Sequence, residues 1–309
     1  MKFIKRLAIL ATLFVVMLLV AYLILNKNQE SDPMDEIARK HAVGKFIKLS
    51  DGITHYQVLG SLNDRTLLFI HGGGVTGFEV WYKNASYFVE HGFSVLLYDL
   101  YGRGYSDRLS NEYTPELFNR QLNELLDTLQ IQEPISVVSM SMGSMIALDF
   151  AAQKPDAIQK LIMIDPAITG DYRANALLKM PVVSNLLMTL YWYPKAIENQ
   201  RKEFVSEQVF KNYAKRLDYF TGFAGYKHAN YSVWMHVLNQ NKLPLLGKLK
   251  ENTVMLIYGT RDPYFPKGNV DLFLKTYPTL KVSEIYDAGH MPHLERATEV
   301  NPIILEFVF

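Results

Sequence analysis

Residues 134–144 read Pro134-Ile-Ser-Val-Val-Ser-Met-Ser-Met-Gly-Ser144, and this stretch decides the fold. Its first half is an apolar block typical of a strand buried on both faces, and its second half begins a helix. Ser141 lies at the junction between them. A serine on such a turn projects from the carboxyl edge of a parallel sheet, facing the N–H groups that open the helix. The stretch therefore predicts an α/β fold and a serine nucleophile.

A strained turn of this kind requires small residues two positions before and two positions after the nucleophile, because both lie against neighbouring backbone. For Ser141 these positions hold Ser139 and Gly143. For the alternative nucleophile Ser139 they would hold Val137 and Ser141, and valine is branched. We therefore favour Ser141 over Ser139.

Short apolar blocks alternate with helix-like stretches along most of the chain, which predicts a mostly parallel sheet flanked by helices. The eight predicted strands are Phe46–Leu49, Ile53–Leu59, Leu67–His71, Ser94–Asp99, Ile135–Met140, Leu161–Asp165, Val254–Tyr258 and Val282–Tyr286. The predicted helices are Phe78–His91, Thr114–Gln130, Met142–Gln153, Pro266–Thr276 and His293–Phe307. The fold class is thus α/β, with an eight-stranded sheet.

The alternation stops between Pro166 and about Leu246, where the sequence has helical patterns but no convincing buried strand. We interpret residues 167–246 as an inserted helical cap. This stretch is rich in aromatic residues, among them Tyr191, Trp192 and Tyr213. Some of these would form the core of a small helical layer, and others would line a pocket.

The N-terminus carries Lys2, Lys5 and Arg6, followed by an uncharged apolar run from Leu7 to Leu25. At ~1.5 Å rise per residue this run makes a helix of roughly 28 Å, close to the ~30 Å hydrocarbon core of a bilayer. A cleavable signal peptide is the alternative, but its apolar region is usually only about 7–15 residues long and ends in a small-residue site. We favour an uncleaved transmembrane segment.

Basic residues before the run favour a cytoplasmic N-terminus. We therefore expect a cytoplasmic tail (1–6), a transmembrane signal anchor (7–25), a polar tether (26–43) and a folded domain (44–309). The folded domain would lie on the extracytoplasmic side of the cell membrane in a single-pass protein. It would be secreted if the N-terminal segment were cleaved.

Composition excludes several classes of function. The 309 residues have a net charge of +1, so there is no basic footprint for nucleic acid. The chain has no cysteine, which excludes disulfides, thiolate metal sites and a cysteine nucleophile. Its apolar content of 49% is ample for a large core.

A glycine run, His71-Gly72-Gly73-Gly74, follows the third predicted strand. Glycines let backbone N–H groups approach a ligand without interference from side chains. Beside a nucleophilic serine, such a loop would supply an oxyanion hole, shared between the N–H groups of Gly73 and Met142. A glycine-rich turn without a ligand is the alternative.

Asp262 and His290 each follow a predicted strand, which places both at the carboxyl edge of the sheet. A serine hydroxyl needs an imidazole base, and that base needs a carboxylate to orient it. The order serine, acid, histidine fits this fold. Asp165 and Asp99 also end strands, and His293 competes with His290, so these stay as alternatives.

The chain resembles the α/β-hydrolase superfamily, in its cap-bearing subgroup, from about residue 44 to the end. The motifs are the His71 glycine run, Asp99-Leu-Tyr-Gly-Arg-Gly-Tyr-Ser106, the turn around Ser141, Gly259-Thr-Arg-Asp262 with Pro266, and Gly289-His-Met-Pro-His-Leu-Glu295. The resemblance implies a nucleophile, an acid, a base and two oxyanion donors: Ser141, Asp262, His290, Gly73 and Met142. It also implies that residues 99–106 form a structural loop near the site. The chain departs from the family pattern at Ser139 and Ser144, where glycines are usual.

The expected reaction is two-step acyl transfer through an acyl-enzyme, with no metal and no organic cofactor. The aromatic cap and the apolar N-terminal helix favour a small hydrophobic substrate, a carboxylic ester of a lipid-like or similar molecule. The alternatives within the fold are a C–C bond hydrolase and a proline-type aminopeptidase, in which Glu198, Glu203 or Glu207 would hold the amine. A non-catalytic ligand-binding protein is the alternative of another class.

Overall fold

The sheet contains eight strands in the order β1-β2-β4-β3-β5-β6-β7-β8. The computed structural model describes residues 2–62, 65–131, 134–170 and 176–309. The strands are β1 (Lys45–Lys48), β2 (Ile53–Leu59), β3 (Thr66–Ile70), β4 (Ser94–Tyr98), β5 (Ile135–Met140), β6 (Ile158–Ile164), β7 (Val254–Gly259) and β8 (Lys281–Ile285). β2 pairs antiparallel with β1 and β4, and every other neighbouring pair is parallel. The predicted mostly parallel, eight-stranded sheet is confirmed.

The central strands are buried on both faces, as their apolar composition predicts. Every residue of β3, β4 and β5 is buried. Because successive side chains of a strand point to opposite faces, Val137 and Val138 of β5 belong to two separate core clusters. The sheet therefore lies between two hydrophobic layers.

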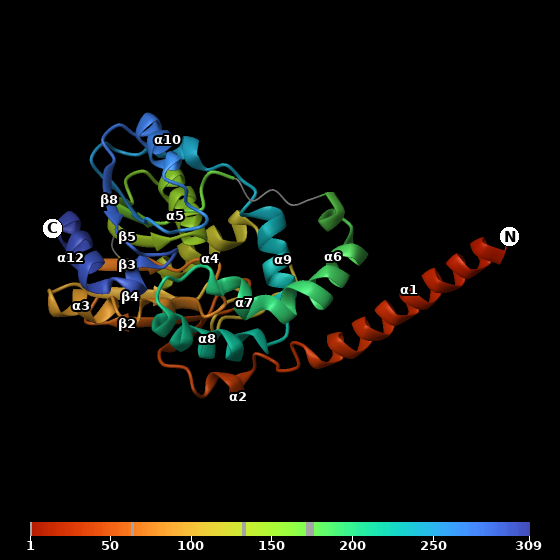
Figure 1. Ribbon diagram of the computed structural model, residues 1–309. Helices are drawn as coiled ribbons and strands as arrows, with labels where there is room; N and C mark the ends of the chain where they lie inside the picture. The colour runs from red at the N-terminus through yellow and green to blue at the C-terminus, as the bar shows by residue number, and fades with distance from the viewer. Residues whose placement is uncertain (1, 63–64, 132–133, 171–175) are drawn as a thin grey trace.

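Helices cover both faces of the sheet (Figure 1). On the Val137 face lie α4 (Pro115–Thr128), α5 (Met142–Gln153) and α10 (Gly268–Thr276), whose apolar residues share one core cluster. On the opposite face lie α3 (Ala85–Glu90) and α12 (Ala297–Val308). The hydroxyl of Thr114 accepts a hydrogen bond from the N–H of Leu117 at 3.3 Å and so caps α4.

Two predicted helices are divided in the structure. The stretch 78–91 contains a 3₁₀ helix, η1 (Gly77–Trp81), and then α3, separated at Asn84. The buried side-chain amide of Asn84 donates hydrogen bonds to the carbonyl of His293 and to the side chain of Asn301. Near the C-terminus, α11 (Pro292–Glu295) and α12 are separated by Arg296, whose backbone is not helical. At Asn84 these tertiary contacts outweigh the helical pattern.

Between β6 and β7 the described residues form helices and add no strand to the sheet. These are η2 (Ala176–Lys179), α6 (Pro181–Leu187), η3 (Met188–Trp192), η4 (Tyr193–Lys195), α7 (Ala196–Arg201), α8 (Glu207–Thr221), α9 (Tyr226–His236) and η5 (Leu243–Lys248). We refer to this stretch as the helical insertion.

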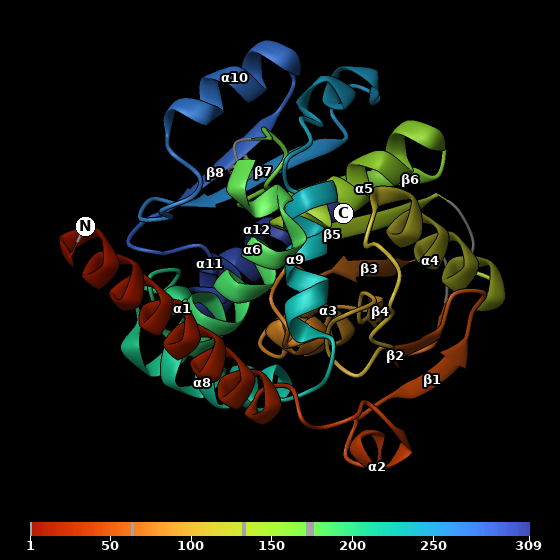
Figure 2. The same cartoon turned by 90° about the vertical axis from the view of Figure 1, so that its right-hand side faces the viewer.

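The N-terminus forms a single long helix, α1 (Lys2–Asn28), followed by the short α2 (Glu36–Arg39). Among the described residues only α1 is long and apolar enough, by length and composition, to cross a membrane. The most apolar window of this helix has a mean hydropathy of 2.9, and none of the window is buried in the protein. In Figures 1 and 2, α1 leaves the face of the molecule that carries α6 and α9.

Candidate active site

Ser141 lies on a sharp turn between β5 and α5. Its φ of 47° and ψ of −121° are rarely adopted by a residue with a side chain. A Cβ atom at Gly143 would lie 2.5 Å from the carbonyl oxygens of both Ile70 and His71. The turn therefore leaves no room for a side chain at position 143, and it holds Ser141 in a strained conformation of the kind found at functional sites.

The two departures from the usual glycines lie against each other. The hydroxyls of Ser139 and Ser144 are 3.1 Å apart, and Ser139 also donates to the carbonyl of Ile162 at 3.0 Å. Both serines are fully buried. Their hydroxyls thus have hydrogen-bond partners in each other and in β6, which explains how the fold tolerates them. The hydroxyl of Ser139 is committed to this structural pair.

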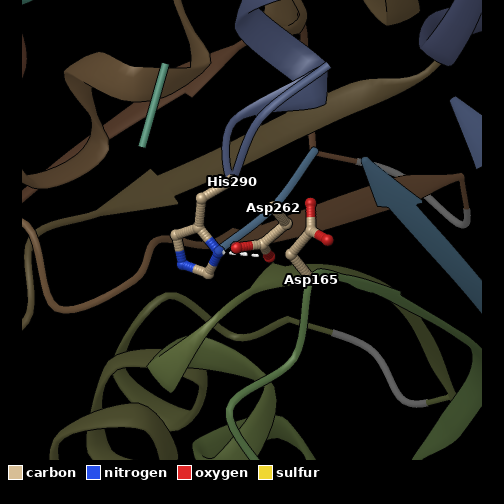
Figure 3. Close-up of side chains that lie close together, drawn as sticks. All are labelled: Asp165, Asp262 and His290. Atoms are coloured by element: carbon tan, nitrogen blue, oxygen red, sulfur yellow. Dashed lines mark hydrogen bonds and ion pairs between the residues drawn. The ribbon is translucent and has the colours of Figure 1, made fainter. Parts of the chain in front are cut away.

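His290 and Asp262 form a buried hydrogen-bonded pair. Nδ1 of His290 lies 2.7 Å from Oδ2 of Asp262, and Figure 3 shows the two side chains facing each other. Asp262 follows β7, where its Oδ1 also accepts from the N–H of Tyr264 at 2.7 Å. His290 follows β8, and its own N–H is held by the carbonyl of Glu203 at 2.8 Å. The carboxylate thus fixes the orientation of the ring and leaves Nε2 to act.

The electrostatics of this pair favour charge separation. Burial alone would raise the pKa of Asp262, but the charge and hydrogen bond of His290 outweigh it and lower the pKa. Burial would likewise lower the pKa of His290, but the charge and hydrogen bond of Asp262 raise it above its usual range. An imidazolium at His290 is therefore stabilised, as a general base requires.

Asp165, an alternative acid, lies beside Asp262 but has a different environment (Figure 3). Burial first, and then the charge of Asp262, raise the pKa of Asp165 well above its usual range. It is also bonded to the N–H of Gly259 at 3.1 Å. A neutral Asp165 donates a hydrogen bond to Asp262 and so supports its negative charge. Asp165 is better suited to support the acid than to replace it.

Asp165, Asp262 and His290 lie close enough together to suggest a metal site. Their chemistry points instead to shared protons, because the imidazole and Asp262 are directly bonded and a protonated Asp165 is a poor ligand.

The remaining alternatives for the acid and the base, Asp99 and His293, have surroundings that suit structural roles. Asp99 accepts hydrogen bonds from the N–H groups of Phe78 and Tyr105 and from His55, so it closes the loop of residues 99–106. His293 is fully buried against Trp81, with ring centroids 4.5 Å apart. Burial lowers the pKa of His293 to about 3, which is too low for a general base at neutral pH.

The glycine loop that carries Gly73 is fixed by two buried side chains. Nδ1 of His71 lies 2.7 Å from the carbonyl of Gly72, and Nε2 accepts from the N–H of Leu100 at 3.0 Å. Burial lowers the pKa of His71 to about 4, so the ring is neutral at physiological pH. Arg103 donates from Nε to the carbonyl of Gly73 at 2.7 Å. The loop is therefore held rigidly beside Ser141.

One cavity of about 400 Å³ brings together most of the predicted site residues. Gly73, Ser141, Met142 and His290 all line it, and Asp262 lies behind His290. The helical insertion supplies much of the wall through apolar side chains, including Leu178, Met188, Trp192, Val233 and Trp234. A larger cavity of about 910 Å³, lined by His55, Trp81 and Arg216, contains none of the predicted catalytic residues.

Some polar residues of the cavity wall, Arg103 among them, were not assigned to it from the sequence. Arg103 is almost fully buried and connects the carbonyl of Gly73 to the amide of Asn230 on α9, at 3.3 Å. Its position in the Gly-Arg-Gly turn after β4, at the carboxyl edge, was the available signal. Glu203 lines the cavity too, and burial raises its pKa to about 7. Glu198 and Glu207, the other acids considered for binding an amine, do not line the cavity.

Comparisons with known proteins agree with the fold. Residues 65–297 match the family model described as alpha/beta hydrolase fold. A relative from Paraburkholderia phymatum, named 2-hydroxy-6-oxononadienedioate/2-hydroxy-6-oxononatrienedioate hydrolase, is 28% identical over 294 residues, covering 86% of this chain and 96% of the relative. A relative from Comamonas testosteroni, named 2-hydroxy-6-oxo-6-phenylhexa-2,4-dienoate hydrolase, is 26% identical and covers 84% of this chain and 92% of its own length. The crystal structure of an enol-lactonase from Burkholderia xenovorans superposes with a TM-score of 0.70 at 19% identity, covering 85% of this chain and 99% of that one.

Proposed function

This chain belongs to the α/β-hydrolase fold family, and on that premise we propose that it is a serine hydrolase that acts through Ser141, His290 and Asp262. One observation carries the proposal. The strained Ser141 and the imidazole of His290, itself bonded to Asp262, line the same cavity.

The proposed reaction begins when the Ser141 hydroxyl attacks the carbonyl carbon of the substrate. Nε2 of His290 accepts the hydroxyl proton, and Asp262 stabilises the resulting imidazolium. The N–H groups of Gly73 and Met142 bind the oxyanion that develops on the carbonyl oxygen. The leaving group takes the proton from His290, and a water molecule, activated by the same imidazole, releases the acyl group from Ser141.

The proposed substrate is a carboxylic ester with a hydrophobic portion, because the cavity wall above Ser141 is largely apolar. Cleavage of a C–C bond next to a ketone is the second candidate. It is favoured by the names of the two relatives, which are both hydrolases of unsaturated 2-hydroxy-6-oxo acids. Both reactions break a bond to a carbonyl carbon, so the same nucleophile and oxyanion donors would serve either.

We also propose that α1 anchors the protein in a membrane and that the domain from residue 44 onward lies outside the cytoplasm, with residues 167–246 as a cap over the site. The uncharged run of residues 7–25 and the basic residues before it support this arrangement. Protease added to intact cells should digest the domain from outside. Full protection of residues 44–309 until the cells are lysed would refute this orientation.

The catalytic proposal is tested by comparing two serine variants of the full chain. Ser141→Ala should abolish labelling by a fluorophosphonate probe and lower kcat by on the order of 10⁴-fold, because triad members act as a unit. Ser139→Ala is the matched control, since the Ser139 hydroxyl bonds to Ser144 and to the carbonyl of Ile162 on β6. Normal labelling of the Ser141→Ala variant would refute the assignment.

The substrate class is tested by direct competition between the two candidates. p-Nitrophenyl esters of graded acyl length should be turned over with a preference for longer chains. The second assay uses 2-hydroxy-6-oxo-6-phenylhexa-2,4-dienoate, a substrate taken from the name of the Comamonas testosteroni relative. Rapid cleavage of this compound with no esterase activity would favour the C–C hydrolase.

A further inference from the structure

The helical insertion carries an apolar outer surface next to α1, and we propose that this surface docks onto the membrane that α1 enters. The cavity would then take its substrate, an ester of a membrane lipid, directly from the bilayer. This inference rests on the proposed hydrolase function and on α1 as the anchor.

The surface is formed by residues 180–194, which we call the docking segment. It runs through α6 and η3 without a single charged residue. Three of its large apolar side chains face solvent: Val182, Met180 and Tyr191 are 73%, 54% and 51% exposed. Exposed apolar residues that gather on one short segment mark a contact surface rather than ordinary surface variation.

The lysines on either side of the docking segment and the aromatic residues at its C-terminal end fit a bilayer surface. Lys179 precedes it and Lys195 follows it, where their charges could meet lipid phosphates. Tyr191, Trp192 and Tyr193 occupy its C-terminal end, and aromatic rings of this kind concentrate at membrane interfaces. A second protein would not require basic flanks next to a transmembrane helix, so the lipid surface is the occupant that the chemistry favours.

The docking segment is attached to the end of α1 by hydrogen bonds. The Gln29 side chain, just past α1, donates from Nε2 to the carbonyl of Thr189 at 3.0 Å. The N–H of Glu30 donates to the hydroxyl of Tyr193 at 3.4 Å. Gln29 is buried in this contact. Where α1 leaves the membrane, the docking segment therefore lies beside it.

A buried lysine makes this junction rigid. Nζ of Lys227 on α9 donates to Asn26 at 2.9 Å, Gln29 at 3.2 Å and Thr189 at 3.3 Å, and it pairs with Glu30 at 3.4 Å. Both charged side chains are about nine-tenths buried. Removing either partner of such a pair leaves a buried charge uncompensated, so the contact holds one orientation. The insertion is thus fixed to the anchor and is not free to swing on a loose tether.

The inner side of the same segment forms part of the active-site cavity. Met188 and Trp192, on η3, line the cavity that contains Ser141. Trp192 packs edge-on against Trp234, with ring centroids 4.5 Å apart. A single apolar layer therefore separates the proposed bilayer surface from the nucleophile, and in Figures 1 and 2 this layer lies on the α1 side of the molecule.

The first experiment measures where the docking segment lies in a reconstituted membrane. Because the chain has no cysteine, Val182→Cys introduces a single site for a nitrobenzoxadiazole label. The full chain is reconstituted into vesicles of phosphatidylcholine and phosphatidylglycerol, and flotation verifies insertion. Leu272→Cys is the control, because Leu272 is also exposed, at 44%, and its helix α10 lies apart from α1 in both views.

We expect doxyl-labelled lipid to quench the label at position 182 and to leave the label at position 272 unaffected. Quenching of both labels by aqueous iodide would overturn the proposal. Protection of position 182 from both quenchers would show that a second protein copy covers the segment, which would also overturn it. Failure of the protein to float with the vesicles would refute the anchor and the docking surface together.

The second experiment separates docking from catalysis. The variant Met180→Asp/Val182→Asp should hydrolyse a long-chain ester embedded in vesicles about tenfold more slowly, because two charges oppose insertion of the segment. It should hydrolyse the soluble p-nitrophenyl acetate at the wild-type rate, since neither residue lines the cavity. Leu272→Asp is the matched control. Equal rates of the variant and the wild type on the vesicle substrate would refute docking but not the hydrolase function. A wild-type protein that hydrolyses none of these esters would refute the proposed function itself.

Discussion

Two carboxyl groups lie side by side behind His290, and their environments assign them different states. Asp262 is bonded to the imidazole and has a lowered pKa, whereas burial and the neighbouring charge raise the pKa of Asp165. Two like charges this close together cannot both be stable in a buried site. One proton is therefore held on Asp165, and the negative charge lies on the residue that faces the base.

This difference predicts opposite results for two conservative substitutions. Asp262→Asn should lower kcat by on the order of 10⁴-fold, because the imidazolium loses its partner and the ring its correct tautomer. Asp165→Asn should lower kcat by only a few-fold, because a neutral amide can still donate to Asp262. Steady-state kinetics on a p-nitrophenyl ester gives both values. A severe defect in Asp165→Asn together with a mild one in Asp262→Asn would reverse the assignment.

The same pair predicts the pH dependence of the reaction. His290 must be neutral to act as a base, and Asp262 raises its pKa above the usual 6.5. The value of kcat/KM should therefore rise with pH and reach its half-maximum above pH 6.5. In the residual activity of Asp262→Asn, burial is opposed only by the charge of Glu203, so the half-maximum should move to lower pH than in the wild type. An acidic limb that is identical in the two proteins would contradict this account.

At the scale of elements, the turn between β5 and α5 is the most constrained feature of the molecule. It brings the start of α5 so close to β3 that a methyl group at Gly143 would meet two backbone carbonyl oxygens at 2.5 Å. Backbone on both sides of that contact cannot move aside as a flexible side chain could. The strained φ of Ser141 depends on this close approach.

Gly143→Ala should therefore destabilise the protein by about 2–4 kcal/mol and distort the site. The matched control is Gly268→Ala at the start of α10, where a Cβ would meet nothing within 4 Å. That change should alter the free energy of unfolding by no more than about 1 kcal/mol. Denaturant unfolding of the full chain in detergent measures both. Equal stabilities for the two variants would show that the turn is looser than described.

At the scale of the whole molecule, buried neutral histidines link stability to pH. His293 is fully buried, and its pKa is lowered to about 3 by burial. In the unfolded chain this group takes up a proton below its usual value of 6.5. Between pH 6.5 and about 3 the unfolded state therefore binds one more proton, and each fall of one pH unit costs up to ~1.4 kcal/mol of stability.

Replacement of this histidine should flatten the acid side of the stability profile. The free energy of unfolding of His293→Leu should fall between pH 7 and pH 5 by about 2 kcal/mol less than that of the wild type. His91→Leu is the control, because His91 is exposed on the surface. Unfolding in denaturant at the two pH values gives the difference. Parallel losses in the wild type and the His293 variant would show that His293 does not carry this pH dependence.

The junction between α1 and the helical insertion also belongs to this scale. Composition alone predicts a polar tether over residues 26–43, and polar composition does not reveal a buried partner. Lys227, about two hundred positions later in the chain, supplies that partner through its contacts with Asn26 and Gln29. Such a pairing is set by tertiary packing and has no local signal in the sequence.

The sequence by itself determined the eight strands, their alternation with helices and the turn around Ser141. These features are visible in local composition, because strands buried on both faces are apolar and the turn needs Gly143. Only the tertiary structure decided the state of each acid behind His290, the mutual pairing of Ser139 with Ser144, and the place of Arg103 and Glu203 in the cavity wall. The physical reason is that pKa values and buried hydrogen bonds depend on which groups, distant along the chain, exclude water from one another. The local hydrophobic pattern of the sequence indicates whether a residue is buried, whereas only the tertiary structure shows which residues it packs against.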